Sequence, residues 1–253
     1  MSLDPRATRG FGQAAECYER GRPSYPPAAI ARLIDKLGVT RGAAVLDLAA
    51  GTGKLTRLLL PYVTRVIAVE PVASMRSEFA RQLPTVTALD GAAEAIPVAD
   101  GSVGAVFVGE AFHWFDTPEA AAEIARVLTT GGGMGLLWNT PTWTDQETSW
   151  LPAFRAIVKH HKRAAGTYPA GDGEWERALA RTRLFDTVHH ACDSHVQRLT
   201  VDDFVAQVAS WSWIAGLSDT KRAAVLADVR ALLRAQTEIV IPHRTDVYWT
   251  RRR

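Results

Sequence analysis

The sequence predicts an α/β fold, in which a doubly wound and mostly parallel sheet of seven strands ends in an antiparallel strand. Five short apolar stretches without polar alternation predict strands that are covered on both faces. They are residues 44–48, 65–69, 85–89, 103–108 and 133–138. Helical segments lie between them, which indicates crossovers on both faces of the sheet. Polar residues follow several of these stretches, at the edge where doubly wound sheets bind ligands.

The elements of the first half follow from local signals. Residues 4–20 predict an N-terminal arm with a helical turn, and a proline-rich stretch breaks the chain after it. Pro27 suits the first turn of a helix that runs through Leu37 and ends at Gly38. Helices between the strands are expected at 53–60, 73–82 and 117–128.

The second half has a less regular pattern. Helices are expected at 147–165, 174–183, 201–213 and 218–238, and strands at 187–199 and 241–250. The two strands would complete the sheet, with the last one antiparallel. The helices then lie in insertions that could roof the crevice at the carboxyl ends of the strands.

Composition limits the class of protein. The 253 residues are 47% hydrophobic and 22% charged, which is typical of a globular protein long enough for one large domain. No apolar run reaches the ~20 residues of a membrane helix. The N-terminus lacks a charged-then-apolar leader pattern. We therefore expect a cytoplasmic protein that binds no membrane.

Residue spacing disfavours several other partners. Cys17 and Cys192 predict neither a disulfide framework nor a metal site. The two His-His pairs lack ligand spacing, so no metal is expected. The net charge of +2 owes much to Arg251–Arg253, which we interpret as a solvated C-terminus. The sequence has no basic stripe with interleaved aromatic residues, so we expect no nucleic-acid binding. The oligomeric state stays open.

The most informative stretch is Val45–Gly53, a short buried strand that ends in a glycine-rich turn. Gly51 and Gly53 let the backbone turn tightly and approach a ligand without a Cβ in between. Glu70 follows the next strand, where it can accept hydrogen bonds from a ribose diol. These residues predict a cofactor that contains a nucleoside, although a glycine turn alone can simply connect a strand to a helix.

Three such cofactors compete for the turn. A P-loop requires Ser or Thr after its Gly-Lys pair and an earlier first Gly, whereas Leu55 follows Lys54 and Leu48 takes the place of that Gly. A dinucleotide fold requires a third glycine, which is missing after Gly53. S-adenosylmethionine remains, because it has no pyrophosphate and needs a glycine turn, an acid on the ribose and an apolar adenine slot.

Further motifs surround the turn. They are Leu46–Gly53, Val69-Glu70-Pro71 with Met75, Ala92–Pro97, Glu110–Phe115 and Arg126–Gly132. In this order and spacing they resemble the motifs of the class I S-adenosylmethionine-dependent methyltransferases, and the resemblance covers roughly residues 10 to 140. Tyr18–Pro26 and His113–Phe115 are similar to the subgroup that includes trans-aconitate methyltransferase.

The resemblance implies a Rossmann-like fold, S-adenosyl-L-methionine as cofactor and methyl transfer to a small-molecule substrate. It implies a cofactor site built from the motif residues and the arm. These residues are Tyr18, Arg22, Asp47, Ala49, Ala50, Gly51, Gly53, Glu70, Pro71, Met75, Ala92, Ala93, Glu94 and Glu110. The chain departs from the family at Ala49, where Gly is usual, and at Ala92, where Asp or Ser is frequent. A polar contact to adenine would then come from backbone or from Glu94.

The resemblance also implies that the N-terminal arm, residues 1–30, folds over the cofactor. Arg22 or Tyr18 could then hold a carboxylate of the methionine or of the substrate. The alternative is an arm that merely packs on the sheet. We expect one domain over residues 1–253, with 139–186 and 200–240 as substrate-lid insertions.

Methyl transfer requires in-line attack on the sulfonium methyl, and the protein mainly positions the partners and excludes water. A carboxylate acceptor is already ionised and needs no general base, and the resemblance favours this O-methylation. A phenol, alcohol or amine would gain from a base. His113 is the candidate, and its alternative is a packing role in the cofactor wall. N- or C-methyl transfer, and cofactor binding without catalysis, also stay open.

Several aromatic and polar residues near the expected crevice or lid are candidates for substrate binding, because aromatic rings line small-molecule pockets. They are Tyr25, Trp114, Asn139, Trp143, Trp211 and Trp213. Any single Trp could instead belong to the core. The identity of the acceptor does not follow from the fold.

Overall fold

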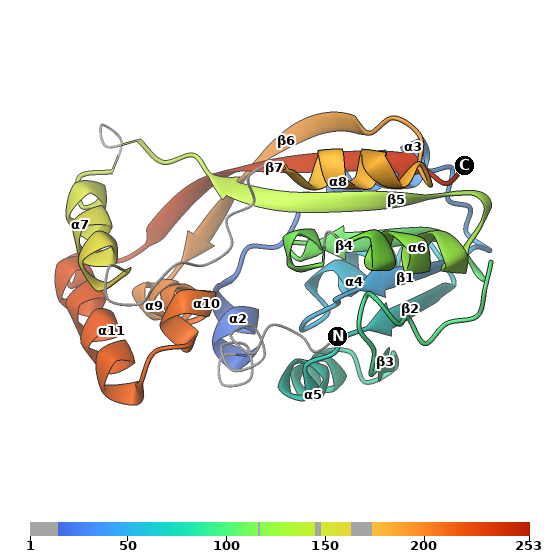
Figure 1. Cartoon of the computed structure of the whole chain (residues 1–253). Coiled ribbons are helices and arrows are strands. Elements are labelled where there is room, and N and C mark those ends of the chain that lie inside the picture. Colours follow the sequence, from blue (N-terminus) through green and yellow to red (C-terminus); the bar gives the residue numbers. More distant parts are fainter. Residues whose placement is uncertain (1–14, 116, 145–147, 163–173) are drawn as a thin grey trace.

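The computed structural model describes residues 15–115, 117–144, 148–162 and 174–253, and within these ranges seven strands form one sheet (Figure 1). The strands are β1 (Ala44–Leu48), β2 (Arg65–Val69), β3 (Ala88–Leu89), β4 (Val103–Gly109), β5 (Leu128–Pro141), β6 (His189–Leu199) and β7 (Ile239–Arg251). Their order is β3-β2-β1-β4-β5-β7-β6. Strands β1 to β5 pair in parallel, and β7 is antiparallel to both β5 and β6. The predicted fold class is confirmed.

The central pair of strands sets the position of the site. β1 lies between β2 and β4, and the sheet extends outward in both directions from the β1–β4 pair. Leu48 at the end of β1 is level with Val69 at the end of β2. Residues that directly follow these strands therefore meet at one edge of the sheet, which is where doubly wound folds bind ligands.

Helices cover both faces of the sheet, because neighbouring residues of a strand point to opposite faces. The helices on the sheet are α3 (Pro27–Lys36), α4 (Lys54–Leu59), α5 (Ala73–Gln82), α6 (Pro118–Val127) and α8 (Glu174–Thr182). Helices α3 and α4 pack with Val45 and Phe107 on one face, and α5 packs against β2 on that same face. Helices α6 and α8 pack with Leu46 and Val106 on the other.

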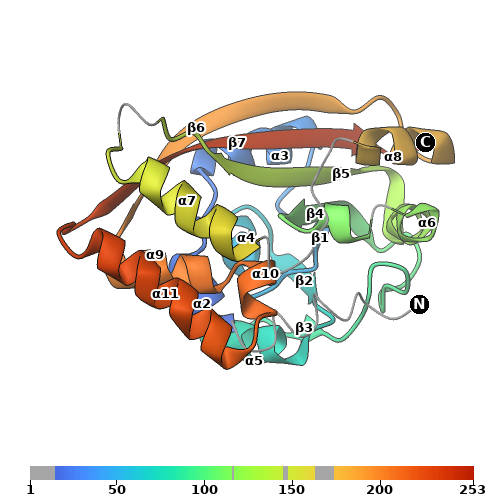
Figure 2. The same ribbon diagram turned by 60° about the vertical axis from the view of Figure 1, so that its left-hand side comes forward.

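A group of four helices, which we term the helical cap, lies at one end of the sheet (Figures 1 and 2). Its members are α7 (Leu151–Lys162), α9 (Val201–Ala209), α10 (Ser212–Ala215) and α11 (Asp219–Leu233). Phe154, Phe204 and Val225 form its core together with Ile241 from β7. Helix α2 (Ala15–Gly21) packs against α9. None of the helices in the described ranges is long and apolar enough to cross a membrane.

Several elements differ from the sequence-based expectation, and the helix expected at 218–238 ends at Leu233. The helix expected over 201–213 ends at Ala209, because the Ser210 hydroxyl bonds back to the Gln207 carbonyl and Trp211 adopts an extended conformation. The strand expected at 85–89 is only Ala88–Leu89, since the preceding residues form a turn. Strand β5 is longer than expected, because it continues to pair with β7 as far as Pro141.

The two helices between β5 and β6 lie apart. Helix α7 belongs to the helical cap, whereas α8 packs against α6 on the face of the sheet. Trp175 of α8 is buried there, with its ring centroid 5.4 Å from that of Trp138 and 5.7 Å from that of Phe112. Among the described residues of the segment 139–186, α7 therefore belongs to the cap and α8 does not.

Candidate active site

A cavity of about 270 Å³ opens at the carboxyl ends of β1 and β4, between the sheet, the arm and the helical cap. It is lined by Tyr18, Arg22, Pro23, Tyr25, Asp47, Ala49, Ala50, Gly51, Thr52, Lys54, Leu55, Gly109, Glu110, Asn139, Pro141, Trp143, Gln207, Trp211 and His243. The lining mixes indole rings with carboxylates and cations, as in small-molecule sites that fix the orientation of a ligand.

The turn after β1 has left-handed backbone at three positions. Ala49, Gly51 and Gly53 have φ angles of 58°, 57° and 87°. A Cβ built on Gly51 has no heavy atom within 4 Å, so the turn leaves open space beside it. A Cβ on Gly53 would lie 2.7 Å from Leu83 Cδ1, so Gly53 permits close packing of the turn on α5. The two glycines therefore have different physical roles.

Glu70 connects the ends of β1 and β2. Its Oε2 accepts the Gly51 N–H at 2.9 Å and its Oε1 accepts the Val72 N–H at 2.8 Å. Burial raises the pKa of this carboxyl, and the two backbone N–H groups oppose the rise. Glu70 lies next to the glycine turn without being part of the cavity lining.

Two further acids face the cavity. Asp47 Oδ2 accepts a hydrogen bond from the Thr56 hydroxyl at 2.5 Å, and its Oδ1 has no hydrogen-bond partner in the described part of the chain. Glu110 has a φ of 58° and accepts the Asn139 N–H at 2.5 Å. Burial raises the pKa of each carboxyl to about 7. A cation entering the cavity would favour their ionised forms.

The arm closes one side of the cavity. Arg22 donates from Nε to the Ser210 hydroxyl at 2.9 Å and from Nη2 to the Ser210 carbonyl at 3.2 Å. Its guanidinium carbon lies 5.3 Å from the centre of the Tyr18 ring, as in a cation–π contact. Tyr25 is buried against β4, where a Cβ at Gly109 would approach its hydroxyl to 2.3 Å.

Glu19 ties the arm to the glycine turn. Its carboxylate accepts the Thr52 hydroxyl at 2.6 Å and pairs with Arg57 at 2.6 Å, and its carbonyl accepts Lys54 Nζ at 2.6 Å. On the other side, Arg20 pairs with Asp203 of α9 at 2.8 Å. The arm therefore bridges the turn after β1 and the helical cap.

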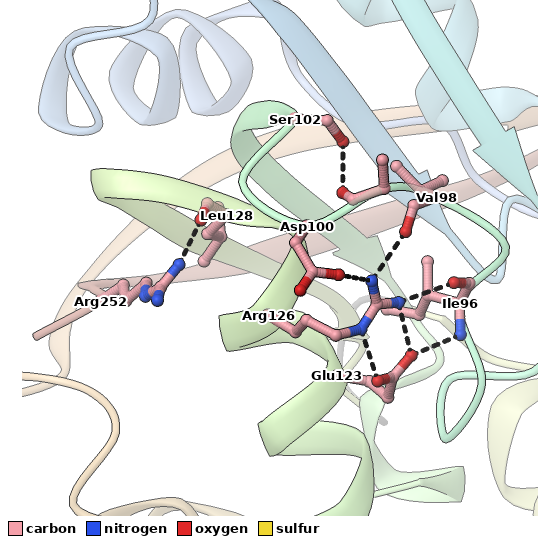
Figure 3. A network of polar contacts seen from close by, with 9 residues as sticks. Ile96, Val98, Asp100, Ser102, Glu123, Arg126, Leu128 and Arg252 are labelled. Atoms are coloured by element: carbon pink, nitrogen blue, oxygen red, sulfur yellow. Dashed lines mark hydrogen bonds and ion pairs between the residues drawn. The ribbon is translucent and has the colours of Figure 1, made fainter.

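The motif at Ala92–Pro97 is held by α6 (Figure 3). Arg126 Nη2 donates to the Ile96 carbonyl at 2.8 Å and Nη1 to the Val98 carbonyl at 2.9 Å. Glu123 accepts the Ile96 N–H at 2.9 Å, and the hydrogen bonds from Arg126 hold the pKa of its carboxyl below the ordinary value. These bonds fix the loop after β3 beside the sheet edge.

His113 lies in the one-turn helix η1 (Phe112–Trp114), just past β4. Its Nδ1 lies 3.5 Å from Trp138 Nε1. Since an indole N–H can only donate, Nδ1 accepts, and the hydrogen of the neutral ring is on Nε2. Burial lowers the pKa of His113, and Arg22 lowers it further.

The structure brings most of the predicted residues to one edge but divides them into two groups. Eleven line the cavity: Tyr18, Arg22, Tyr25, Asp47, Ala49, Ala50, Gly51, Glu110, Asn139, Trp143 and Trp211. The others lie outside its lining: Gly53, Glu70, Pro71, Met75, Ala92, Ala93, Glu94, His113, Trp114 and Trp213. Trp213 is buried in the core of the helical cap.

Sequence reasoning missed four polar residues of the lining, which are Thr52, Lys54, Gln207 and His243. His243 is level with Pro141 in the antiparallel β5–β7 pair, which places it at the carboxyl end of β5. The strand expected at 241–250 includes His243. Its position beside Pro141 depends on the register between β5 and β7, which are distant in the sequence. Gln207 reaches the cavity through the docking of α9 on the arm, which no local pattern indicates.

Comparisons with known proteins agree with this geometry. A family model described as "Methyltransferase domain" matches residues 46–135. An uncharacterized methyltransferase of Mycobacterium bovis is 47% identical over 148 residues, so the match spans 58% of this chain and only 58% of that relative. A methyltransferase-like protein of Schizosaccharomyces pombe is 30% identical over 214 residues, which are 84% of this chain and 81% of the relative.

Solved structures share the fold. A candidate type II methyltransferase from Anaeromyxobacter dehalogenans has a TM-score of 0.65 at 22% identity, over 91% of this chain and 97% of that chain. Geranyl diphosphate C-methyltransferase from Streptomyces coelicolor, solved with S-adenosyl-L-homocysteine, has a TM-score of 0.53 at 14% identity, over 99% of both chains.

The fold and its cavity define a Rossmann-like protein with a pocket at the sheet edge where such folds bind ligands. The match to the Schizosaccharomyces pombe relative extends over most of both chains. This chain belongs to the methyltransferase family.

Proposed function

We propose that this chain transfers a methyl group from S-adenosyl-L-methionine to a small-molecule acceptor in the cavity, with a carboxylate oxygen as the preferred acceptor atom. The observation that carries the proposal is the sheet edge where the open side of Gly51, the buried acid Glu70 and the cavity adjoin. Family membership supports the activity. The motifs that resemble the trans-aconitate methyltransferase subgroup support the carboxylate.

The residues at the sheet edge fit the cofactor. When bound, S-adenosyl-L-methionine supplies an electrophilic methyl group on a sulfonium. Each oxygen of Glu70 accepts one backbone N–H and keeps a lone pair that a ribose hydroxyl can use. The open side of Gly51 admits a ligand close to the backbone. Buried Ala93 and Ile96 give the loop after β3 the apolar character that an adenine slot requires.

The two acids of the cavity suit a cationic ligand. Asp47 and Glu110 are buried carboxyls whose pKa values of about 7 would fall if a positive charge came close. Binding of the sulfonium would thus be favoured over binding of the thioether product, which lacks this positive charge. We propose that Asp47 and Glu110 provide the negative charge that surrounds the methyl donor.

A carboxylate acceptor requires no general base, and the polar groups of the site agree with this chemistry. The neutral ring of His113 has its accepting nitrogen bonded to Trp138, so we assign it to the cofactor wall. Arg22 has five guanidinium N–H groups, of which two bond to Ser210, and the rest can hold a carboxylate.

We also propose that the arm, residues 1–30, and the insertions 139–186 and 200–240 enclose the ligands. Tyr18 and Arg22 of the arm line the cavity. Trp143 and Trp211, one from each insertion, line its other side with indole rings. In the first insertion this role falls to the part around α7, since α8 packs on the sheet.

Calorimetric titration of the full chain with S-adenosyl-L-methionine and with S-adenosyl-L-homocysteine tests the proposal first. Micromolar binding of both is expected. An acceptor screen that begins with small carboxylic acids and extends to phenols and amines then identifies the accepting atom by mass spectrometry. Binding without transfer to any acceptor would favour a non-catalytic cofactor-binding protein, and transfer to amines or carbon alone would contradict the O-directed assignment.

A further inference from the structure

Two polar side chains in the cavity wall are buried with an unused hydrogen-bonding atom. His243 of β7 is 2% exposed and Gln207 of α9 is 6% exposed. Neither His243 Nδ1 nor Gln207 Oε1 has a hydrogen-bond partner among the described residues. Both residues line the cavity on the side of the helical cap. A buried polar atom without a partner costs free energy, so such a pair in a cavity wall points to a ligand that completes it.

A chain of hydrogen bonds fixes the tautomer of His243. The Gly21 carbonyl can only accept, so Gln197 must donate to it from Nε2, at 2.8 Å. The Gln197 Oε1 atom is then the acceptor that faces His243 Nε2, at 3.1 Å. His243 therefore has its hydrogen on Nε2, and Nδ1 presents a bare lone pair.

The surroundings of His243 keep its ring neutral. The ring stacks on His195 of β6, with centroids 5.1 Å apart and an interplanar angle of 14°. Burial lowers the pKa of His243 to about 4, and His195 adds to the effect. No acidic side chain within the described ranges forms an ion pair with it. An imidazolium here would be a buried charge without a partner, so His243 suits acceptance of a hydrogen bond better than removal of a proton.

We propose that His243 Nδ1, with Gln207 in the same cavity lining, selects methyl acceptors that offer an O–H or N–H donor to it. The inference rests on the proposed function and sharpens it. A carboxylate acceptor needs no base, and the lone pair of His243 needs a donor. The combination indicates a small carboxylic acid that also bears a hydroxyl or amino group. An acid without that group would leave the lone pair desolvated and unpaired, which strongly disfavours binding.

Matched acids test the selection. Succinate and malate differ by one hydroxyl group, as do phenylacetate and mandelate. Each is titrated calorimetrically into the full chain saturated with S-adenosyl-L-homocysteine, so that no turnover occurs. The hydroxy acid of at least one pair is expected to bind roughly tenfold more tightly than its partner, the effect of one well-made hydrogen bond.

Variants assign the preference to His243. His243→Phe keeps a planar ring against His195 but lacks the nitrogen, and it should abolish the preference for the hydroxy acid. His243→Asn places an amide near Nδ1 and should retain part of it. His195→Phe is the matched control, because His195 lies on the neighbouring strand outside the lining of the cavity. It should leave the preference intact. Cofactor titration and thermal unfolding verify that each variant is folded.

A spectroscopic measurement tests the tautomer without any acceptor. The imidazole nitrogen shifts of ¹⁵N-labelled protein, assigned with His243→Phe, should show a neutral His243 with its hydrogen on Nε2. A hydrogen on Nδ1, equal affinity within both pairs, no binding of any of the four acids, or a preference that survives His243→Phe would each overturn the inference. Failure of the proposed function has a different signature, because the wild type would then bind no S-adenosyl-L-homocysteine.

Discussion

The sheet edge proposed to bind the cofactor, which we term the cofactor edge, and the helical cap are assembled in opposite ways. At the cofactor edge, Asp47, Gly51, Glu70 and Glu110 each come from a strand or from the first residues after it, in one continuous half of the chain. The cap joins α7, α9, α10 and α11 with the start of β7 and packs on α2 from the other end of the chain. The cavity lies between them. Local sequence therefore specifies the sheet edge that we propose for the cofactor, whereas long-range packing creates the cap side that we propose for the acceptor.

Gly51→Ala is expected to have the largest effect on cofactor affinity and only a small effect on stability. It therefore separates the two properties at the cofactor edge. The added methyl group meets no protein atom, so the folded state loses only about 1–2 kcal/mol through left-handed backbone at φ 57°. It occupies the space proposed for the cofactor, so the affinity for S-adenosyl-L-methionine should fall by more than about 100-fold, or roughly 2.7 kcal/mol. Calorimetric titration and thermal unfolding measure the two quantities.

Gly53→Ala is the matched control for Gly51→Ala. Its methyl group would lie 2.7 Å from Leu83 and 3.0 Å from Phe79, at a φ of 87°. Overpacking and backbone strain should together lower the free energy of unfolding by about 2–4 kcal/mol. If Gly51→Ala binds the cofactor like wild type, the ligand does not approach this turn and the proposed cofactor edge is wrong.

Glu70→Ala should have the next largest effect. It removes the charge-assisted hydrogen bonds proposed for the ribose, and the affinity for S-adenosyl-L-methionine should fall by about 1–3 kcal/mol. It also removes the acceptor for the Gly51 and Val72 N–H groups. Glu70→Gln separates the two roles, since it keeps the size and one accepting oxygen. An unchanged cofactor affinity in Glu70→Ala would refute the ribose assignment.

The contrast between the two regions also explains what could be predicted from the sequence. The strand ends with Asp47, Glu70 and Glu110 were predictable, because a buried strand followed by a polar residue is a local pattern. The doubly wound class of the sheet followed from the alternation of strands and helices. The different roles of Gly51 and Gly53 were not predictable, because they depend on whether α5 packs against the turn.

The side of the cavity that faces the helical cap was harder to predict from the sequence. The role proposed for His243 depends on its register opposite Pro141 and on its hydrogen bond to Gln197. The break at Ser210 shortens α9 and positions the hydroxyl that binds Arg22, yet it interrupts a stretch with continuous helical periodicity. Tertiary hydrogen bonds overrode the local preference in this case, and such bonds have no signature in a single sequence.

The buried acids predict a pH dependence of stability. Burial raises the pKa of the Asp47 carboxyl to about 7 in the folded chain from its ordinary value of 3.8, so between these values the folded state retains a proton that the unfolded state has lost. The free energy of unfolding should therefore decrease as pH rises from about 4 to about 7, by about 1 kcal/mol per pH unit for this group. Asp47→Asn should flatten that slope in denaturant titrations, with Glu110 accounting for the remainder. A slope that Asp47→Asn leaves unchanged would contradict the raised pKa.

Arg22→Lys should produce the smallest of these effects, because it loosens the connection between the two regions without removing either. Lysine keeps the positive charge but cannot bond the Ser210 hydroxyl and carbonyl together, as Arg22 does at 2.9 and 3.2 Å. A looser arm should weaken cofactor binding by about threefold, or roughly 0.7 kcal/mol. Arg20→Lys is the control, since Arg20 of α2 forms an exposed ion pair with Asp203 of α9, and the substitution should leave affinity unchanged. Equal losses in both variants would mean that the arm acts through its general docking on α9, whereas a loss confined to Arg22→Lys places the link between cofactor and cap at Ser210.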